Sequence, residues 1–146
     1  MKIKSISIRN HSRISDCALD VRDNLILVGA NGSGKSSIIR CIDLVLGKTT
    51  QQLYYSIDST DFEDEELPFV VEVKLGLFST DELTFFPDEY DESDESLTVR
   101  LEAILDGDDL TIKRYFPRMG DANNLRRDKL DSIGWSMIHS DFSTTQ

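Results

Sequence analysis

Five segments of the chain have the residue pattern of β-strands, in most of which apolar and polar residues alternate so that one face can be buried. These segments are residues 3–8, 17–21, 69–77, 97–105 and 110–116. The last two flank the turn Asp106-Gly107-Asp108-Asp109, which is rich in residues that favour tight turns. The sequence therefore predicts an antiparallel hairpin over residues 97–116.

A different pattern lies between residues 25 and 47. Residues 25–28 form a continuous apolar run that ends at a glycine, which is typical of a strand buried on both faces in a largely parallel sheet. From Ser36 onward the apolar residues follow the period of one helix face, and Gly47 is a natural C-cap. We therefore expect a strand, a glycine loop and a helix in direct succession.

The remaining segments carry weaker signals. We expect a turn or helix cap at residues 59–61, a short helical turn within residues 79–86, a helix over residues 124–133 and a last strand over residues 135–139. Residues 49–55 show no clear period. Six of the ten residues 87–96 are acidic, so we expect a mobile acidic loop there, within a single domain that spans residues 1–146.

The net charge of −11 comes from the middle of the chain. Residues 58–109 carry two Lys or Arg against nineteen Asp or Glu, whereas residues 1–57 carry eight against four. Such a segment repels a phosphate backbone, so direct binding of nucleic acid by it is disfavoured. A solvated surface loop is a better interpretation than an acidic docking site for a basic partner.

Several classes of protein are disfavoured by what the sequence does not contain. No apolar run approaches the roughly 20 residues that cross a bilayer, and the first residues have no secretory signal, so we expect a cytoplasmic protein that does not enter the membrane. Cys17, Cys41, His11 and His139 have no metal-ligand spacing and suggest no catalytic triad. The two cysteines are expected to be small buried residues.

Residues 29–36 fit the phosphate-binding pattern G-x-x-x-x-G-K-[ST] at every fixed position. Gly32 and Gly34 allow the backbone N–H groups to surround an anion, and the following helix adds its positive end. Lys35 would reach the β- and γ-phosphates, and Ser36 would bind Mg²⁺. Ser37 is placed to meet the α-phosphate. The predicted nucleotide-binding residues are Asn31, Gly32, Ser33, Gly34, Lys35, Ser36 and Ser37, with ATP and Mg²⁺ as ligands.

The sequence has no equally clear motif for hydrolysis. P-loop ATPases use a second apolar strand that ends in an Asp for Mg²⁺, often followed by a Glu that orients water. The nearest candidates, residues 104–106 and 136–141, are too short or too polar. We therefore expect nucleotide binding without unaided hydrolysis, and we assign no catalytic residue.

Residues 6–14 and 25–42 together resemble the ATPase head of the ABC-type group that contains SMC, RecF-like and OLD (overcoming lysogenisation defect) proteins. Residues 58–62, Asp-Ser-Thr-Asp-Phe, look most like the OLD branch, whose complete members carry a Toprim nuclease domain. The resemblance implies an α/β fold of the P-loop NTPase class. This would be the first lobe of an ABC-type head, with a mixed sheet around the P-loop helix and an antiparallel hairpin layer.

The resemblance also implies partners and a role. ATP would lie between two heads, so we expect a homodimer or a second ATPase half. In family members the signature segment, the Asp-Glu strand and the switch histidine come later, which implies that this chain is incomplete and contacts DNA only through parts not present here. The implied role is DNA repair or anti-phage defence, as an ATP-dependent endonuclease when complete. Family members usually have Asn-Phe-Arg-Ser where this chain has Asn10-His11-Ser12-Arg13, so the arginine that approaches the nucleotide is either Arg13 or absent.

Two alternatives remain open at this stage. One is a non-catalytic interaction module that keeps the nucleotide fold and uses its acidic segment to engage a basic partner. The other is a small nucleotide kinase, which needs arginines converging on the phosphates. For it, the available cluster is Arg114, Arg118, Arg126 and Arg127. Phe85, Phe86 and Tyr90 are expected to pack in the core or within the loop rather than to stack on a base.

Overall fold

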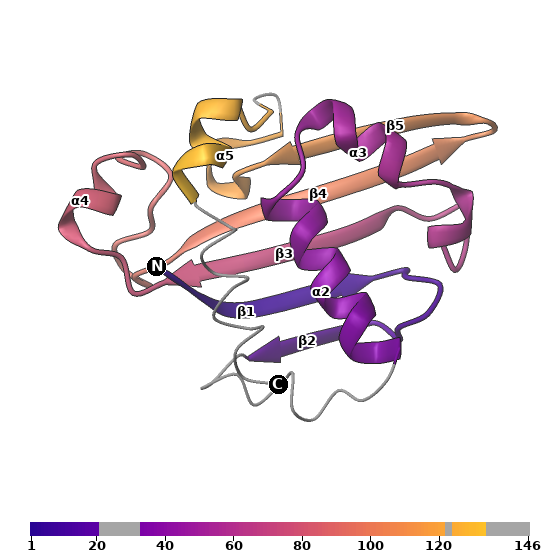
Figure 1. The fold of residues 1–146 in the computed structure, drawn as a ribbon, viewed down its shortest axis with the longest axis horizontal. Helices are drawn as coiled ribbons and strands as arrows, with labels where there is room; N and C mark the ends of the chain where they lie inside the picture. The colour runs from indigo at the N-terminus through magenta and orange to yellow at the C-terminus, as the bar shows by residue number, and fades with distance from the viewer. Residues whose placement is uncertain (21–32, 122–123, 134–146) are drawn as a thin grey trace.

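The centre of the molecule is a five-stranded antiparallel sheet in the order β2-β1-β3-β4-β5 (Figure 1). The structure is a computed structural model that describes residues 1–20, 33–121 and 124–133. The sheet places β1 between β2 and β3, so that Lys2 near the N-terminus pairs with Gly76. The strands are β1 (Lys2–Arg9), β2 (Cys17–Asp20), β3 (Phe69–Gly76), β4 (Leu97–Asp106) and β5 (Asp109–Tyr115).

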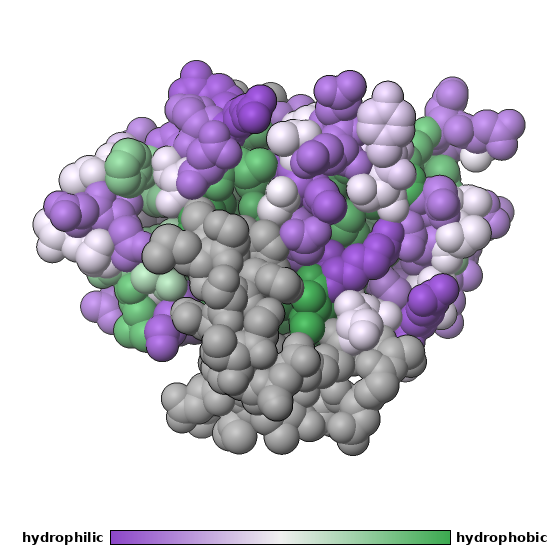
Figure 2. Space-filling view, viewed as in Figure 1, coloured by the Kyte–Doolittle hydropathy of each residue, from purple (hydrophilic) through white to green (hydrophobic). Residues whose placement is uncertain are grey.

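Three helices lie on the same face of this sheet (Figure 1). They are α2 (Ser33–Leu46), which crosses the middle strands, α3 (Thr50–Ser56) beside β5, and α5 (Arg127–Ile133). The short helix α4 (Thr80–Leu83) and the 3-10 helices η1 (Ser59–Asp61) and η2 (Pro117–Met119) lie in the connections. Seen from the helix side, the described surface is mostly hydrophilic, with small hydrophobic patches (Figure 2).

The strand register explains why the helices cover only one face. Ile6 pairs with Val73, which in turn pairs with Val99, and all three side chains are buried beneath the helices. Most residues of the opposite face are polar and at least partly exposed, and there Arg100 Nε and Nη2 bind Glu72 Oε1 at 2.8 Å and 2.6 Å. We call this the polar face. Alternation of period two thus produces one dry side, on which α2 packs, and one wet side.

Helix α2 packs on the sheet through one apolar stripe. Ile38, Cys41, Ile42 and Val45 are all buried, at spacings of three and four residues. The helix ends where the backbone N–H of Gly47 donates to the Asp43 carbonyl at 2.7 Å. Packing against β3 and β4 holds α2 across the centre of the sheet.

The C-terminal end of α2 is capped by Arg114 of β5. The Arg114 side chain is buried, and its Nη1 donates to the carbonyl oxygens of Leu44 at 3.4 Å, Val45 at 3.3 Å and Lys48. These are carbonyls for which the helix itself has no donor. Burial lowers the pKa of Arg114 to about 10, and the negative end of the helix dipole faces the guanidinium.

The structure confirms most of the predicted elements that it describes. The strands predicted from alternation, the hairpin with its turn at residues 106–109, the cap at residues 59–61 and the short helix within residues 79–86 are present. The predicted helix at residues 124–133 begins only at Arg127. The segments 25–28 and 135–139 lie outside the described residues. Every described strand pair is antiparallel, so the mixed sheet that we expected is not seen in this part of the chain.

Residues 77–96, which include the acidic loop 87–96, connect the neighbouring strands β3 and β4. The backbones of Leu77 and Glu95, at its two ends, have φ of 56° and 53°, in the left-handed region. Asp94 forms ion pairs with Lys4 at 3.8 Å and Lys74 at 3.0 Å, and Phe86 packs in the core as expected. Phe85 is half exposed instead. The mobility of residues 87–96 stays a prediction.

Candidate functional site

The phosphate-loop motif runs into the first turn of α2. Residues 29–32 lie outside the described residues, whereas Ser33 begins the helix and Ser36 is exposed on it. Ser37 is buried, with only 7% of its surface exposed. The predicted Mg²⁺ ligand Ser36 therefore lies where solvent can reach it, while the α-phosphate contact of Ser37 stays a prediction.

The N-terminal end of α2 suits an anion. The helix has 14 residues, and its first turn contains no acidic residue. The first N–H groups of a helix lack intrahelical acceptors, and aligned peptide dipoles give that end a partial positive charge. A phosphate group at this position would satisfy both, and the exposed Ser36 hydroxyl fits a Mg²⁺ ligand beside it.

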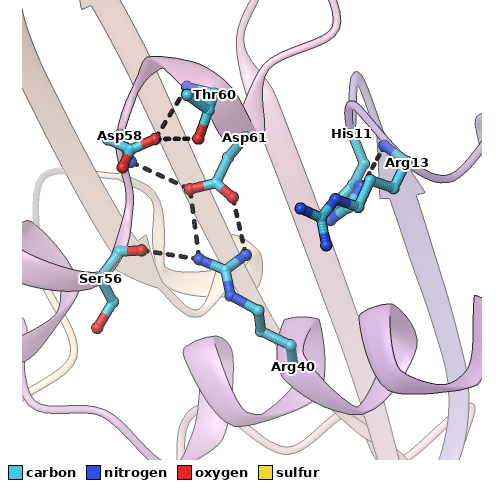
Figure 3. A network of polar contacts seen from close by, with 7 residues as sticks. All are labelled: His11, Arg13, Arg40, Ser56, Asp58, Thr60 and Asp61. Atoms are coloured by element: carbon cyan, nitrogen blue, oxygen red, sulfur yellow. Dashed lines mark hydrogen bonds and ion pairs between the residues drawn. The ribbon is translucent and has the colours of Figure 1, made fainter. Parts of the chain in front are cut away.

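One turn after Ser36, α2 is joined to the segment that follows α3 (Figure 3). The guanidinium of Arg40 donates to Asp61 Oδ1 at 3.0 Å and Oδ2 at 3.3 Å, and to the Ser56 carbonyl at 2.7 Å. We call this set of contacts the Arg40 latch. It ties the P-loop helix to both the end of α3 and η1.

Asp61, the carboxylate that binds Arg40, is itself held in place by hydrogen bonds. Asp61 Oδ2 accepts from the backbone N–H of Asp58 at 3.0 Å, and Asp58 Oδ1 accepts from the Thr60 backbone at 2.9 Å and from the Thr60 hydroxyl. The hydroxyl and backbone bonds from Thr60 lower the pKa of Asp58. The 3-10 turn thus presents the Asp61 carboxylate in a fixed orientation.

The loop between β1 and β2 lies beside this segment. Asn10 has φ of 62°, and its side-chain amide donates to the Asp64 and Leu67 carbonyls and accepts from the Asp64 N–H, each at 2.8 Å. The Ser12 N–H donates to the Asp61 carbonyl at 2.9 Å. The structure thereby joins residues 10–12 to residues 61–67, which are far apart in the sequence.

His11 is buried next to the latch. Its Nδ1 accepts from the Arg13 N–H at 2.9 Å, and its ring centre lies 5.7 Å from that of Phe69. This bond places the proton of the neutral ring on Nε2, which has no partner among the described residues. Burial lowers the pKa of His11, the Asp61 carboxylate acts in the opposite direction, and the Arg40 and Arg13 charges lower it further.

Acidification is expected to destabilise the domain through His11. Because its folded-state pKa lies below 6.5, the unfolded chain takes up the proton at a higher pH than the folded domain. The free energy of unfolding should therefore decrease as the pH falls below about 6.5 and level off below the folded-state pKa. Urea denaturation between about pH 7.5 and about pH 5.5 measures this slope.

The control for the acid slope is His11→Asn. An asparagine carboxamide can still accept from the N–H two residues on, but it does not titrate. We expect a flatter pH dependence in this variant. An identical slope in the two proteins would rule out His11 as its source.

The other sequence candidates have structural roles where they are described. Cys41 is fully buried and Cys17 partly so, and burial raises the pKa of Cys41 to about 12, which makes it a poor nucleophile. Arg114 caps α2 and cannot join arginines around a phosphate, so the structure removes one member of the proposed kinase cluster. His139 lies outside the described residues. Within residues 1–20, 33–121 and 124–133, no group of three or more His, Cys, Asp or Glu could hold a metal ion.

With this geometry established, the comparisons assign the chain to a family. A family model described as an AAA ATPase domain matches residues 1–139. The chain belongs to this family of AAA ATPase domains. A search of the curated proteins finds no match. Membership of this family implies that the chain binds ATP, and AAA ATPase domains usually bind it together with Mg²⁺. No helix in the described ranges has the length and apolar character needed to cross a membrane.

Sequence reasoning missed the residues that position the P-loop helix of this AAA ATPase domain. Arg40 and Asp61 lie within the segments 25–42 and 58–62 that carry the family resemblance, but no role was assigned to either residue. The sequence does contain a signal for helix α3, because Thr49 and Gln52 have the spacing of a capping box and form one in the structure. That helix brings the Ser56 carbonyl to Arg40.

Proposed function

We propose that this AAA ATPase domain binds Mg-ATP at residues 29–37, as the N-terminal lobe of an OLD-like or RecF-like ATPase associated with DNA repair or anti-phage defence. The observation that carries the proposal is the combination of a complete phosphate-loop motif with a 14-residue helix whose first turn has no acidic residue. Backbone N–H groups, a helix dipole and a lysine then converge on one anion.

Each residue of the motif has a distinct role in this proposal. Gly32 and Gly34 let the backbone approach the phosphates, and Lys35 neutralises the β- and γ-phosphates. Ser36 supplies a hydroxyl to Mg²⁺. Asn31, Ser33 and Ser37 complete the set by donating to the phosphate oxygens.

Contacts between distant segments support the OLD-like branch. The resemblance rests on residues 6–14 and 58–62 as well as on the phosphate loop. The Glu63 N–H donates to the Asn10 carbonyl at 3.1 Å, and His11 and Phe62 form an antiparallel bridge. The two segments that carry the resemblance therefore belong to one structural unit beside α2. In this unit Arg13 is exposed and remains the candidate for the arginine that approaches the nucleotide.

In this proposal hydrolysis and DNA chemistry require other parts. A second copy or a second ATPase half closes over the ATP, and other parts of the protein or its partners supply the catalytic residues that this sequence does not show. DNA is contacted through those parts or through partners, since residues 58–109 repel a phosphate backbone. The complete protein would act as an ATP-dependent endonuclease.

Replacing Lys35 with alanine tests the site. Charge-assisted bonds to phosphate contribute roughly 1.5–3 kcal/mol each, so the Kd for Mg-ATP is expected to rise by about tenfold to a hundredfold. Isothermal titration calorimetry with Mg-ATP measures it. The control is Lys48→Ala, because Lys48 lies beyond the other end of α2 and pairs with Asp43 at 3.4 Å. Equal affinities of the wild type and Lys35→Ala would contradict the assignment.

A further inference from the structure

The Arg40 latch lies close to the proposed nucleotide site and has no role in it so far. Arg40 follows Ser36 by four residues, so the two residues lie on the same side of α2, about 6 Å apart along the helix axis. Any rotation of α2 about its axis that moved Arg40 would turn Ser36 and the first N–H groups by the same angle. A fixed guanidinium therefore fixes the direction of the groups that face the phosphate.

The latch is built to resist such a rotation. Two N–H donors of Arg40 meet two carboxylate oxygens, at 3.0 and 3.3 Å, and the 2.7 Å bond to the Ser56 carbonyl adds a third contact in a different direction. A planar guanidinium bound at three points cannot pivot as a lysine ammonium can. Asp61 is only 15% exposed and is also held by the Asp58 N–H, so its carboxylate cannot follow a moving arginine.

We propose that Arg40 and Asp61 are positioning residues for the nucleotide, which hold the first turns of α2 at the rotation that ATP binding requires. This inference rests on the proposed function, because it assumes ATP at the start of α2. Without the latch, α2 samples rotations in which its N–H groups miss the phosphates. The apparent Kd then rises in inverse proportion to the fraction of molecules in the competent orientation.

The structure offers a matched control on the polar face. Arg100 and Glu72 also form a close ion pair, in which Arg100 Nε and Nη2 both bind Glu72 Oε1, at 2.8 and 2.6 Å. The side-chain exposures are 35% and 30% for Arg100 and Glu72, against 40% and 15% for Arg40 and Asp61. This pair joins β4 to β3 and makes no contact with α2 in the described structure. Loss of either pair should lower stability, but only loss of the latch should change nucleotide affinity.

The experiment compares Asp61→Asn with Glu72→Gln in the full chain. Asparagine keeps the size of the side chain but can offer only one acceptor oxygen to Arg40 and Asp58. We expect the Kd for Mg-ATP to rise by about threefold to tenfold in Asp61→Asn and to stay within about twofold of wild type in Glu72→Gln. Calorimetric titration is done at a temperature where thermal denaturation shows every variant to be folded. Arg40→Lys, which keeps the charge but not the planar fork, should give an intermediate Kd.

Each outcome bears on a specific claim. Wild-type affinity in Asp61→Asn would overturn the positioning role while leaving the proposed function intact. Equal weakening in Asp61→Asn and Glu72→Gln would also overturn it, because general destabilisation would then explain both. A wild-type protein that does not bind Mg-ATP would overturn the proposed function, and the positioning role with it.

Discussion

Alanine at position 114 is expected to lower the free energy of unfolding by about 4 kcal/mol. The guanidinium of Arg114 is buried and donates to the carbonyls of Leu44 and Val45 in the last turn of α2 and of Lys48 just beyond it. Truncation removes the donor of these carbonyls and also opens a cavity. Since a domain of this size is stabilised by roughly 5–15 kcal/mol, the variant should be close to unfolding.

The design that separates these effects includes Arg114→Met. Methionine keeps much of the side-chain volume and removes the cost of burying a charge, so we expect a loss of only about 2 kcal/mol. Urea denaturation followed by circular dichroism gives both values. A loss below about 1 kcal/mol in Arg114→Ala would contradict this prediction. It would mean that the hydrogen bonds from Arg114 stabilise the domain little more than bonds from water to the same carbonyls.

A loss of about 3 kcal/mol is expected when Asn10 is replaced with alanine. The Asn10 side chain makes three hydrogen bonds of 2.8 Å to the backbone of Asp64 and Leu67, and its residue is 8% exposed. The variant leaves those groups without partners. It also keeps an L-residue at φ of 62°, a conformation in which asparagine is better tolerated than alanine.

Two further variants divide this loss into its parts. Asn10→Gly has no backbone strain but also lacks the three hydrogen bonds, so it should be more stable than Asn10→Ala by about 1 kcal/mol. Asn10→Asp keeps the acceptor for the Asp64 N–H and loses the donors. Chemical denaturation ranks the three proteins. An alanine variant as stable as wild type would mean that residues 10–12 and 61–67 are held together by other contacts.

The sequence predicted the elements whose signals are local. Alternation located the strands because a one-sided sheet imposes period two on every strand, and the turn around Gly107 located the hairpin, since this glycine has φ of 64°. Periodicity begins α2 at Ser36 rather than at Ser33, because the first residues of the helix are not apolar. Periodicity detects the buried face of a helix, and not its first turn.

The features that the sequence did not reveal depend on contacts between distant residues. Arg114 would be expected on the surface, as arginine usually is, and its burial follows only once β5 lies beside the end of α2. The amide of Asn10 reaches a carbonyl 54 positions away. Likewise, nothing local in the sequence shows that Arg40 and Asp61 meet. The phosphate-loop motif is recognisable because phosphate binding requires a fixed local sequence, whereas contacts that hold a helix in place can come from any part of the fold.

The position of β1 in the sheet has a consequence for how the domain folds. Strands β4 and β5 are joined by Gly107 and Asp108 alone and can pair within roughly 1–10 μs. In contrast, β1 must find β3 across the whole segment that contains β2, α2 and α3, which has a larger entropic cost. We therefore expect β3, β4 and β5 to assemble first. Because α2 belongs to the loop that β1 closes last, a bound nucleotide would slow unfolding and leave the folding rate almost unchanged.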